Sequence, residues 1–150
     1  MKILLQRSLN SSVTVEEKIV GKIEKGLVLF VSFTEGDSES EIDELVNKVI
    51  NLRIFDDENG IMNKSLLDIN GSVLSISQFT LYADTKKGRR PSYVNALGGE
   101  KANILYNKFN EKLRKLNIHT ETGIFGSDMK VNITNDGPVT IMLESKWLYV

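Results

Sequence analysis

The chain of 150 residues contains no cysteine and one histidine, His119. Without cysteine it can form no disulfide bond, and it offers no thiol nucleophile and no thiolate ligand. One imidazole cannot build a zinc site of the usual nitrogen and sulfur ligands, and a Ser-His-Asp triad would have to use His119. We therefore expect neither a metal nor a cofactor, and we assign His119 to the surface or to a structural role.

A strong net charge and a long apolar run are also missing. The 19 Lys and Arg residues nearly balance the 20 Asp and Glu residues, which gives a formal net charge of −1. No global field therefore attracts nucleic acid, so any RNA contact needs a local patch, and we expect no DNA partner. The longest apolar stretch, residues 26–33, is too short to span a bilayer, and the N-terminus turns polar too early for a signal peptide. These features predict a cytoplasmic protein without a membrane partner.

Strand patterns dominate the sequence and predict one α+β domain over residues 1–150. Residues 27–31 are continuously apolar, which is typical of a strand covered on both faces. Because connections are short, we expect mostly antiparallel pairing, in a curved sheet or open β-barrel with two principal helices packed on it. The predicted strands are residues 1–8, 12–16, 27–31, 72–81, 118–125, 129–135 and 139–144.

Two helices are predicted from their ends and from apolar residues at helical spacing. The first begins at Ser38, with Glu41 three residues later as in a capping box. The second runs from about residue 99 to residue 116, and Asn117 is its predicted stop. The buried stripes are predicted to hold Ile42, Leu45, Val46, Val49 and Ile50 in the first helix, and Ala102, Leu105, Tyr106, Phe109, Leu113 and Leu116 in the second.

The first of two segments that contradict their local pattern is the end of the strand predicted at residues 72–81. A core-like strand here acquires the polar residues Ser77, Gln78 and Thr80. Buried polar groups at these positions would need partners or a substrate, and such conflicts mark functional sites. Spacing alone favours the plainer interpretation that the strand emerges into solvent.

The second segment is Asn135-Asp136-Gly137-Pro138-Val139-Thr140, between two alternating runs. Asp136-Gly137 suggests a hairpin turn, although Pro138 removes a backbone donor and fixes φ at the start of the last strand. The local sequence by itself favours an ordinary trans Gly137–Pro138 bond.

At these residues the chain resembles the D-aminoacyl-tRNA deacylase family. Ser77-Gln78-Phe79-Thr80 is similar to that family's first signature, and the segment from Asn135 to Thr140 is similar to its second. The matches occur in the family's order over essentially the whole chain. Further matches are Gln6-Arg7, Arg53-Ile54-Phe55, Met62-Asn63, Arg90-Pro91-Ser92 and Gly126-Ser127-Asp128-Met129.

The resemblance implies an open antiparallel barrel with outer helices, in a homodimer whose two active sites lie at the interface. Gly137–Pro138 would be cis and would reach from one subunit into the site of the other. There it would crowd an L-aminoacyl group while admitting a D-aminoacyl group or glycine. The residues implied in substrate binding and chiral rejection are Gly137, Pro138, Asn135, Val139, Thr140, Met129 and Arg7, which would help to hold that loop.

The implied substrate is an ester between an amino acid and the 3′-terminal ribose of tRNA. Positioning and donors aimed at the developing oxyanion can suffice for such a labile ester, and the backbone N–H groups around Phe79 and Thr80 are candidate donors. The motif holds no His or Lys to activate the Thr80 hydroxyl. We therefore interpret the catalytic residues Ser77, Gln78, Phe79 and Thr80 as orienting the site for a ribose hydroxyl and a water. Direct attack by Thr80 is the alternative.

The densest basic run is Lys86-Lys87-Gly88-Arg89-Arg90. In isolation it indicates a solvated loop, but within the resemblance Lys86, Lys87, Arg89 and Arg90 would meet tRNA phosphates. Trp147 is a candidate for a subunit contact.

Three other functions stay open. The chain could be a related deacylase that removes an L-amino acid such as alanine, a nonenzymatic tRNA-binding homodimer, or a structural dimer with no RNA partner.

Overall fold

The structure is a computed structural model that describes residues 1–145, so Trp147 lies outside the described residues. Strands and helices alternate irregularly along the chain. The helices are α1 (Glu39–Asn51), α2 (Leu66–Ile69), the 3-10 helix η1 (Phe79–Tyr82) and α3 (Gly99–Lys115). The strands are β1 (Lys2–Ser8), β2 (Ser11–Val15), β3 (Lys18–Ile23), β4 (Gly26–Ser32), β5 (Phe55–Asp56), β6 (Met62–Lys64), β7 (Ser72–Ser77), β8 (Thr120–Thr122), β9 (Lys130–Asn132) and β10 (Asn135–Glu144).

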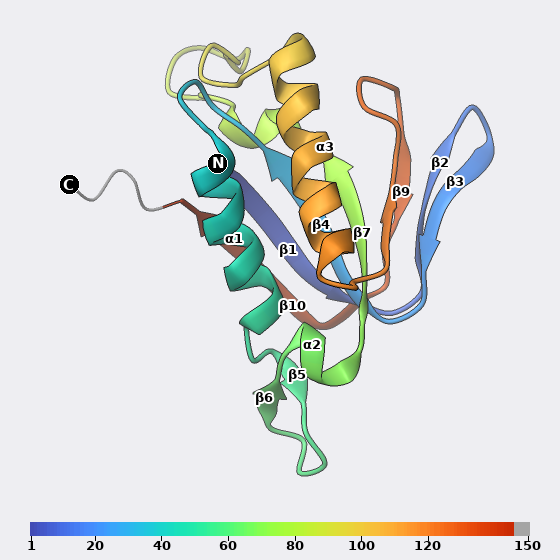
Figure 1. Cartoon of the computed structure of the whole chain (residues 1–150). Coiled ribbons are helices and arrows are strands. Elements are labelled where there is room, and N and C mark those ends of the chain that lie inside the picture. Colours follow the sequence, from blue (N-terminus) through green and yellow to red (C-terminus); the bar gives the residue numbers. More distant parts are fainter. Residues whose placement is uncertain (146–150) are drawn as a thin grey trace.

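A five-stranded sheet with the order β10-β1-β4-β7-β8 forms the centre of the fold (Figure 1). Strand β1 pairs antiparallel with both β10 and β4. The short-connection argument applies to β2 and β3, which also pair antiparallel. Strands β4 and β7, and β7 and β8, pair in parallel. The α+β class with open, curved sheets is confirmed. The five-stranded sheet is mixed, whereas five of the seven strand pairings in the described residues are antiparallel. The two parallel pairings were not expected. They arise because the long connections that carry α1 and α3 return the chain to the same end of the sheet.

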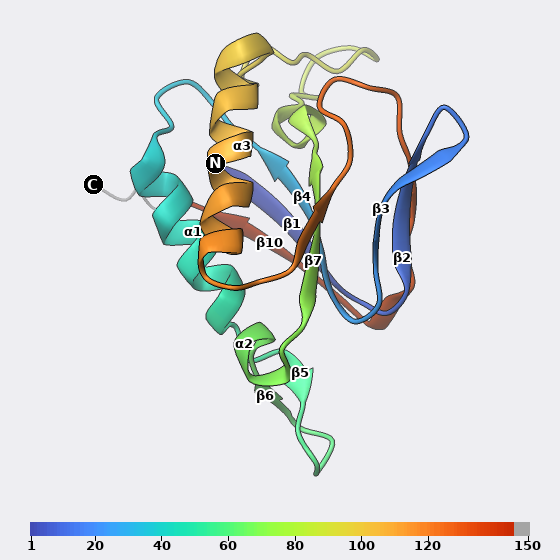
Figure 2. The ribbon, with the colours of Figure 1, turned by 45° about the vertical axis from the view of Figure 1, so that its right-hand side comes forward.

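Helices α1 and α3 cover one face of this sheet, and a second sheet of order β3-β2-β9 lies against part of the other (Figures 1 and 2). Successive side chains of β4 point to opposite faces of the sheet. Leu27 and Leu29 face the helices, while Val28 faces the three-stranded sheet. The continuous apolar run of β4 is thereby explained, because both of its faces are buried. The outward side chains of β1 and β10, Leu4 and Met142 among them, remain partly exposed.

The two predicted helices are confirmed, with differences at their ends. Ser38 is the N-cap of α1, but its hydroxyl accepts from the Ser40 N–H instead of the Glu41 N–H. The Glu41 carboxylate accepts from the hydroxyls of Ser38 and Ser40. Asn117 ends α3 in the left-handed conformation, with φ of 64°. Leu116 is exposed, so its place in the buried stripe was wrong.

Several predicted strand bounds are also wrong. The strands predicted at residues 118–125, 129–135 and 139–144 are Thr120–Thr122, Lys130–Asn132 and Asn135–Glu144. The strand predicted to reach Leu81 ends at Ser77, after which the chain turns into η1. Asp136-Gly137 is not a hairpin turn, because β9 pairs with β2 while β10, which contains Gly137, pairs with β1. The Gly137–Pro138 bond is cis, contrary to the expectation from the local sequence. No helix among residues 1–145 is both long and apolar enough to cross a membrane.

Candidate active site

A pocket of about 460 Å³ opens where β4 and β7 end and α3 begins. Polar groups occupy its strand-side wall and apolar groups much of the remainder, the arrangement expected of a small-molecule site. Its lining residues are Val31, Ser32, Phe33, Ile76, Ser77, Gln78, Phe79, Leu97, Gly98, Gly99, Ala102, Phe125, Gly126, Ser127, Asp128, Met129 and Val131.

The first signature forms the strand-side wall. Ser77 pairs with Val31 in the parallel register, and the Gln78 N–H then donates to the Val31 carbonyl at 2.8 Å. Ser77, Gln78 and Phe79 line the pocket directly. Thr80 is not among the lining residues, but its hydroxyl accepts a hydrogen bond from the Gln78 amide. The end of this strand therefore does not simply emerge into solvent, because Ser77, Gln78 and Phe79 line the pocket.

Backbone donors lie at the same point. In η1 the Leu81 N–H donates to the Gln78 carbonyl and the Ala83 N–H donates to the Thr80 carbonyl. A helix leaves its first N–H groups without intrahelical acceptors. Within residues 1–145, the structure gives the N–H groups of Phe79 and Thr80 no acceptor. These two groups are free to donate to a bound oxygen.

Met129 lies on the opposite wall because Gly123 leaves room for it. A Cβ at Gly123 would lie 2.4 Å from the Met129 sulfur, closer than real side-chain atoms approach. The thioether can therefore pack against the backbone of the β8–β9 connection and reach the pocket. Met129 is the one residue of the predicted chirality set that lines this pocket within a single chain.

The pocket contains little acid–base chemistry. Among the described lining residues Asp128 is the only ionisable group, and its side chain is exposed beside Lys130. His119 is exposed and faces Glu121 at 3.3 Å, and it is not among the lining residues. Tyr82 is not among the lining residues, and burial, together with the negative charges of Asp37 and Glu144, raises its pKa. No group of three or more possible metal ligands occurs in residues 1–145.

Arg7 is buried next to the second signature. Its Nε donates to the Asp136 carbonyl at 3.2 Å and lies 3.2 Å from the Asp136 carboxylate. Its Nη1 donates to the Ile54 carbonyl at 2.8 Å and lies 3.5 Å from Asp56. A Cβ at Gly137 would lie 3.0 Å from Nη2. One guanidinium thus contacts both the β10 segment and the start of β5.

Asn135 and Thr140 form a second polar contact across the same segment. The Asn135 amide is hydrogen-bonded to the Thr140 hydroxyl at 2.9 Å, and the Gln6 amide donates to that hydroxyl at 3.2 Å. Val139 lies between them and packs on the main core. Gly137 and Pro138 are exposed between these anchors.

The structure does not bring the two signatures together within one chain. Ser8 is opposite Asn135 on one side and Gly26 on the other, while Ser77 is opposite Val31 at the far end of β4. Five residues of extended strand separate these ends by roughly 17 Å. In Figure 1 the start of β10 accordingly lies at the lower end of the sheet, whereas β7 ends at the top.

The basic residues Lys86, Lys87, Arg89 and Arg90 lie on an exposed loop between η1 and α3. They are not among the residues that line the pocket. The remaining pocket wall was missed by the sequence analysis. In this wall Leu97 and Gly98 precede α3 and Gly99 is its first residue, and the Gly-Gly pair was the available signal.

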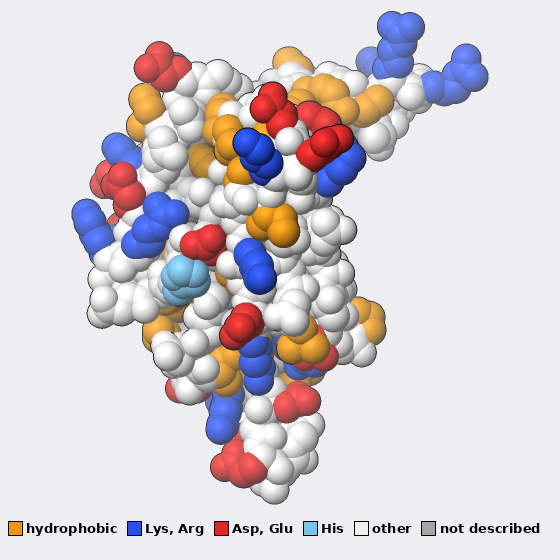
Figure 3. All heavy atoms as spheres, turned by 90° about the vertical axis from the view of Figure 1, so that its right-hand side faces the viewer, with side chains coloured by type: hydrophobic (Ala, Val, Ile, Leu, Met, Phe, Trp, Pro, Cys, Tyr) orange, Lys and Arg blue, Asp and Glu red, His pale blue; other side chains and the backbone are white. Residues whose placement is uncertain are grey.

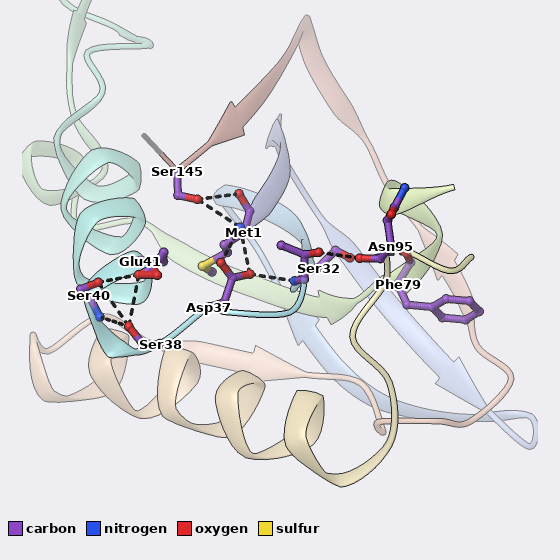
Figure 4. Close-up of polar contacts among 10 residues, drawn as sticks. Met1, Ser32, Asp37, Ser38, Ser40, Glu41, Phe79, Asn95 and Ser145 are labelled. Atoms are coloured by element: carbon purple, nitrogen blue, oxygen red, sulfur yellow. Dashed lines mark hydrogen bonds and ion pairs between the residues drawn. The ribbon is translucent and has the colours of Figure 1, made fainter. Parts of the chain in front are cut away.

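A buried ion pair joins the start of the chain to the segment between β4 and α1 (Figure 4). The Met1 ammonium is 2.9 Å from the Asp37 carboxylate, with side chains 0% and 3% exposed, and it also donates to the Ser145 hydroxyl. Asp37 accepts from the Thr34 N–H at 2.7 Å, and the Thr34 hydroxyl donates to the Asn95 carbonyl at 2.6 Å. The ion pair therefore supports the loop that continues into Leu97.

Comparison with known proteins gives a consistent result. Residues 4–144 match the family model described as D-Tyr-tRNA(Tyr) deacylase. The chain is 55% identical over 146 residues to a D-aminoacyl-tRNA deacylase of Clostridium botulinum (strain Langeland), covering 97% of this chain and 98% of the relative. It is 54% identical to a D-aminoacyl-tRNA deacylase of Bacillus cytotoxicus, with 97% and 100% covered.

Two solved structures have similar folds. The c-Myc DNA Unwinding Element Binding Protein superposes with a TM-score of 0.91 at 39% identity, covering 97% of this chain and 99% of that one. A probable eukaryotic D-amino acid tRNA deacylase superposes with a TM-score of 0.82 at 17% identity, covering 95% and 97%. The second likeness concerns the fold alone.

Proposed function

The chain belongs to the D-Tyr-tRNA(Tyr) deacylase family and is a hydrolase of the aminoacyl-tRNA ester bond, and on this premise we propose how it selects and cleaves its substrate. The substrate is D-aminoacyl-tRNA, with glycyl-tRNA as a second substrate, and the products are the free amino acid and tRNA. The main support for this proposal is that Ser77, Gln78 and Phe79 line the pocket. Among the described lining residues the single ionisable group is the exposed Asp128.

In this proposal the pocket binds the 3′-terminal nucleoside and its aminoacyl ester. The N–H groups of Phe79 and Thr80 stabilise the oxyanion that forms when the ester carbonyl is attacked, a contribution worth about 3–4 kcal/mol per donor in favourable cases. The Gln78–Thr80 hydrogen bond fixes the wall that orients the ester. The neighbouring ribose hydroxyl and a water supply the chemistry, because no described protein base lies beside Thr80.

Chirality is enforced in this proposal by Gly137–Pro138 of a second copy of the chain. Within one chain the segment lies too far from the pocket, yet it is exposed and held by Arg7. A two-fold axis would place each Gly137–Pro138 against the other subunit's pocket, giving two identical sites. The segment would exclude an L side chain by steric clash and leave many D side chains unopposed.

The outer face of β1 and β10 supports dimer formation. Leu4 and Met142 are opposite each other in the register and are partly exposed, and Phe30 is opposite Leu4 on β4. Large apolar side chains that remain exposed side by side on a sheet indicate an interaction surface. The basic residues Lys86, Lys87, Arg89 and Arg90 would then meet phosphates of the tRNA. We place this activity in the cytoplasm, where aminoacyl-tRNA is used.

The decisive experiment incubates the purified protein with matched D- and L-tyrosyl-tRNA. We expect D-tyrosine to be fully released while L-tyrosyl-tRNA remains intact over the same period. Glycine should be released from glycyl-tRNA as well. Equal rates would refute chiral rejection. With L-alanyl-tRNA included in the comparison, selective release of L-alanine would identify an L-specific deacylase, and binding without release would identify a tRNA-binding homodimer.

Replacing Thr80 by alanine is expected to lower kcat only about fivefold, since one hydrogen bond worth about 1 kcal/mol is lost. Single-turnover hydrolysis of D-tyrosyl-tRNA measures this change, with the melting temperature checked in parallel. A substrate that lacks the terminal 2′-hydroxyl should be hydrolysed more slowly by the unaltered protein. Complete loss of turnover in Thr80→Ala with tRNA binding intact would show that Thr80 attacks directly.

A further inference from the structure

A projecting loop next to the pocket carries an unbalanced positive charge. Asp84 and Ser92 close the loop through two backbone hydrogen bonds of 2.8 Å, and Asp84 also accepts from the Lys86 N–H at 3.0 Å. We call residues 84–92 the basic arm. In Figure 2 it projects from the upper right of the molecule, and Figure 3 shows Lys and Arg side chains at the end of this projection. Within residues 1–145 its Lys and Arg residues form no ion pair.

Two aromatic rings lie exposed where the basic arm joins the pocket. Tyr93 directly follows the arm, and its ring meets the Phe79 ring edge-on, with centroids 5.1 Å apart and planes at 70°. Phe79 is 51% exposed and Tyr93 is 41% exposed, although both are large aromatic residues. An edge-to-face pair leaves ring faces available to a third planar group. Phe79 also lines the pocket, so the pair forms its rim.

The Tyr93 position is fixed from both sides. The Ala96 N–H donates to the Tyr93 carbonyl at 3.0 Å, and the Asp84–Ser92 bridge closes the chain immediately before Tyr93. Further along, the Thr34 hydroxyl holds the Asn95 carbonyl at 2.6 Å. Tyr93 is therefore presented on an ordered turn, which lowers the entropic cost of stacking.

The order of pocket, aromatic pair and basic arm suits one kind of ligand. If the pocket holds the 3′-terminal nucleoside, a path across the rim would place the preceding nucleotide beside the aromatic pair and its phosphate toward the arm. Unpaired bases stack on aromatic side chains while basic residues follow the backbone, the usual mode of single-strand recognition. A base inside a duplex is stacked on both faces and would offer none to Tyr93.

We propose that Tyr93 is a substrate-binding residue that stacks on the unpaired nucleotide preceding the aminoacylated terminal nucleoside. This inference rests on the proposed function, because it takes the pocket to be the site of the terminal nucleoside. Tyr93 contributes binding and does not take part in ester cleavage. Base stacking of this kind is worth about 5- to 150-fold in affinity per base.

The test compares Tyr93→Ala and Tyr93→Phe with the unaltered protein on D-tyrosyl-tRNA and on D-tyrosyl-adenosine, which has no preceding nucleotide. We expect Tyr93→Ala to raise KM for the tRNA about tenfold with kcat nearly unchanged. It should leave kcat/KM for D-tyrosyl-adenosine unaltered. Tyr93→Phe keeps the ring and should retain the KM of the unaltered protein. Val94→Ala is the matched control, since Val94 is 82% exposed and lies outside the ring pair.

Each outcome is informative. An equal loss on both substrates would show that Tyr93 only supports Phe79 and the pocket, and an unchanged KM in Tyr93→Ala would show that it does not contact the tRNA. Either result overturns the inference while the unaltered protein remains active. If the unaltered protein released neither D ester, the proposed function itself would fail, and the two failures are thereby distinguished.

Discussion

Replacing Arg7 by methionine is expected to lower kcat/KM for D-aminoacyl-tRNA at least 100-fold, which corresponds to about 2.7 kcal/mol of transition-state stabilisation. The buried guanidinium joins the Asp136 carbonyl to the Ile54 carbonyl. Without it the Gly137–Pro138 segment loses the hydrogen bond from Arg7 to the neighbouring Asp136 carbonyl. A shift of this segment by about 1 Å can lower the rate about 100-fold. We also expect a loss of about 2–4 kcal/mol in unfolding free energy, because buried carbonyls are left unpaired.

The measurement is steady-state deacylation of D-tyrosyl-tRNA together with urea unfolding. Arg53→Met is the matched control, because Arg53 is exposed and bonds Asn63 on the β5–β6 hairpin. Arg7→Lys should recover little activity, since an ammonium cannot reproduce the planar fork that contacts two carbonyls. Full activity in Arg7→Met would show that the segment is positioned without Arg7 and would remove the main support for its role.

Replacing Asp37 by alanine is expected to destabilise the protein by about 3–5 kcal/mol, because the buried Met1 ammonium loses its counter-charge. For a chain of this size that corresponds to a fall in Tm of about 6–20 °C. The Thr34 N–H also loses its acceptor, so the loop that carries Asn95 loosens. Scanning calorimetry measures the change.

The matched control is Asp43→Ala, whose carboxylate pairs with Lys112 at 2.6 Å but on the surface. An exposed pair contributes about 0–1 kcal/mol, so Tm should hardly move. Asp37→Asn should fall between the two, since the amide oxygen can still accept from Thr34 while the charge is gone. Similar small shifts in all three variants would show that the Met1–Asp37 pair contributes little.

The helices and the class of fold were predictable because their signals are local. Ile42, Leu45 and Val49 recur at helical spacing, and Asn117 adopts the left-handed stop that its position indicated. The capping box, by contrast, was placed on the wrong helix. The complete box is formed by Ser65 and Asp68 on α2, a helix of four residues that is too short to show periodicity.

The site was predictable in its residues but not in its geometry. Ser77 and Gln78 were singled out as polar residues after a core strand, and both line the pocket. The turn into η1 was missed, since four residues cannot distinguish a 3-10 helix from the end of a strand. The opposite wall at Leu97 was missed for a different reason. Its place depends on a long-range hydrogen bond to Phe33, which no local pattern records.

The pairing of β1 with β10 determines when the protein can fold during synthesis. Gln6 of β1 bonds Thr140, 134 positions further along, whereas β4 pairs with β1 within the first 32 residues. One edge of β1 therefore stays unpaired until β10 has been synthesised, and contacts of such long range slow folding. A stalled or truncated chain would expose this bare strand edge and would be prone to aggregate. Because β10 also carries Gly137–Pro138, the segment proposed to enter a partner's pocket is translated long after the strand that it pairs with.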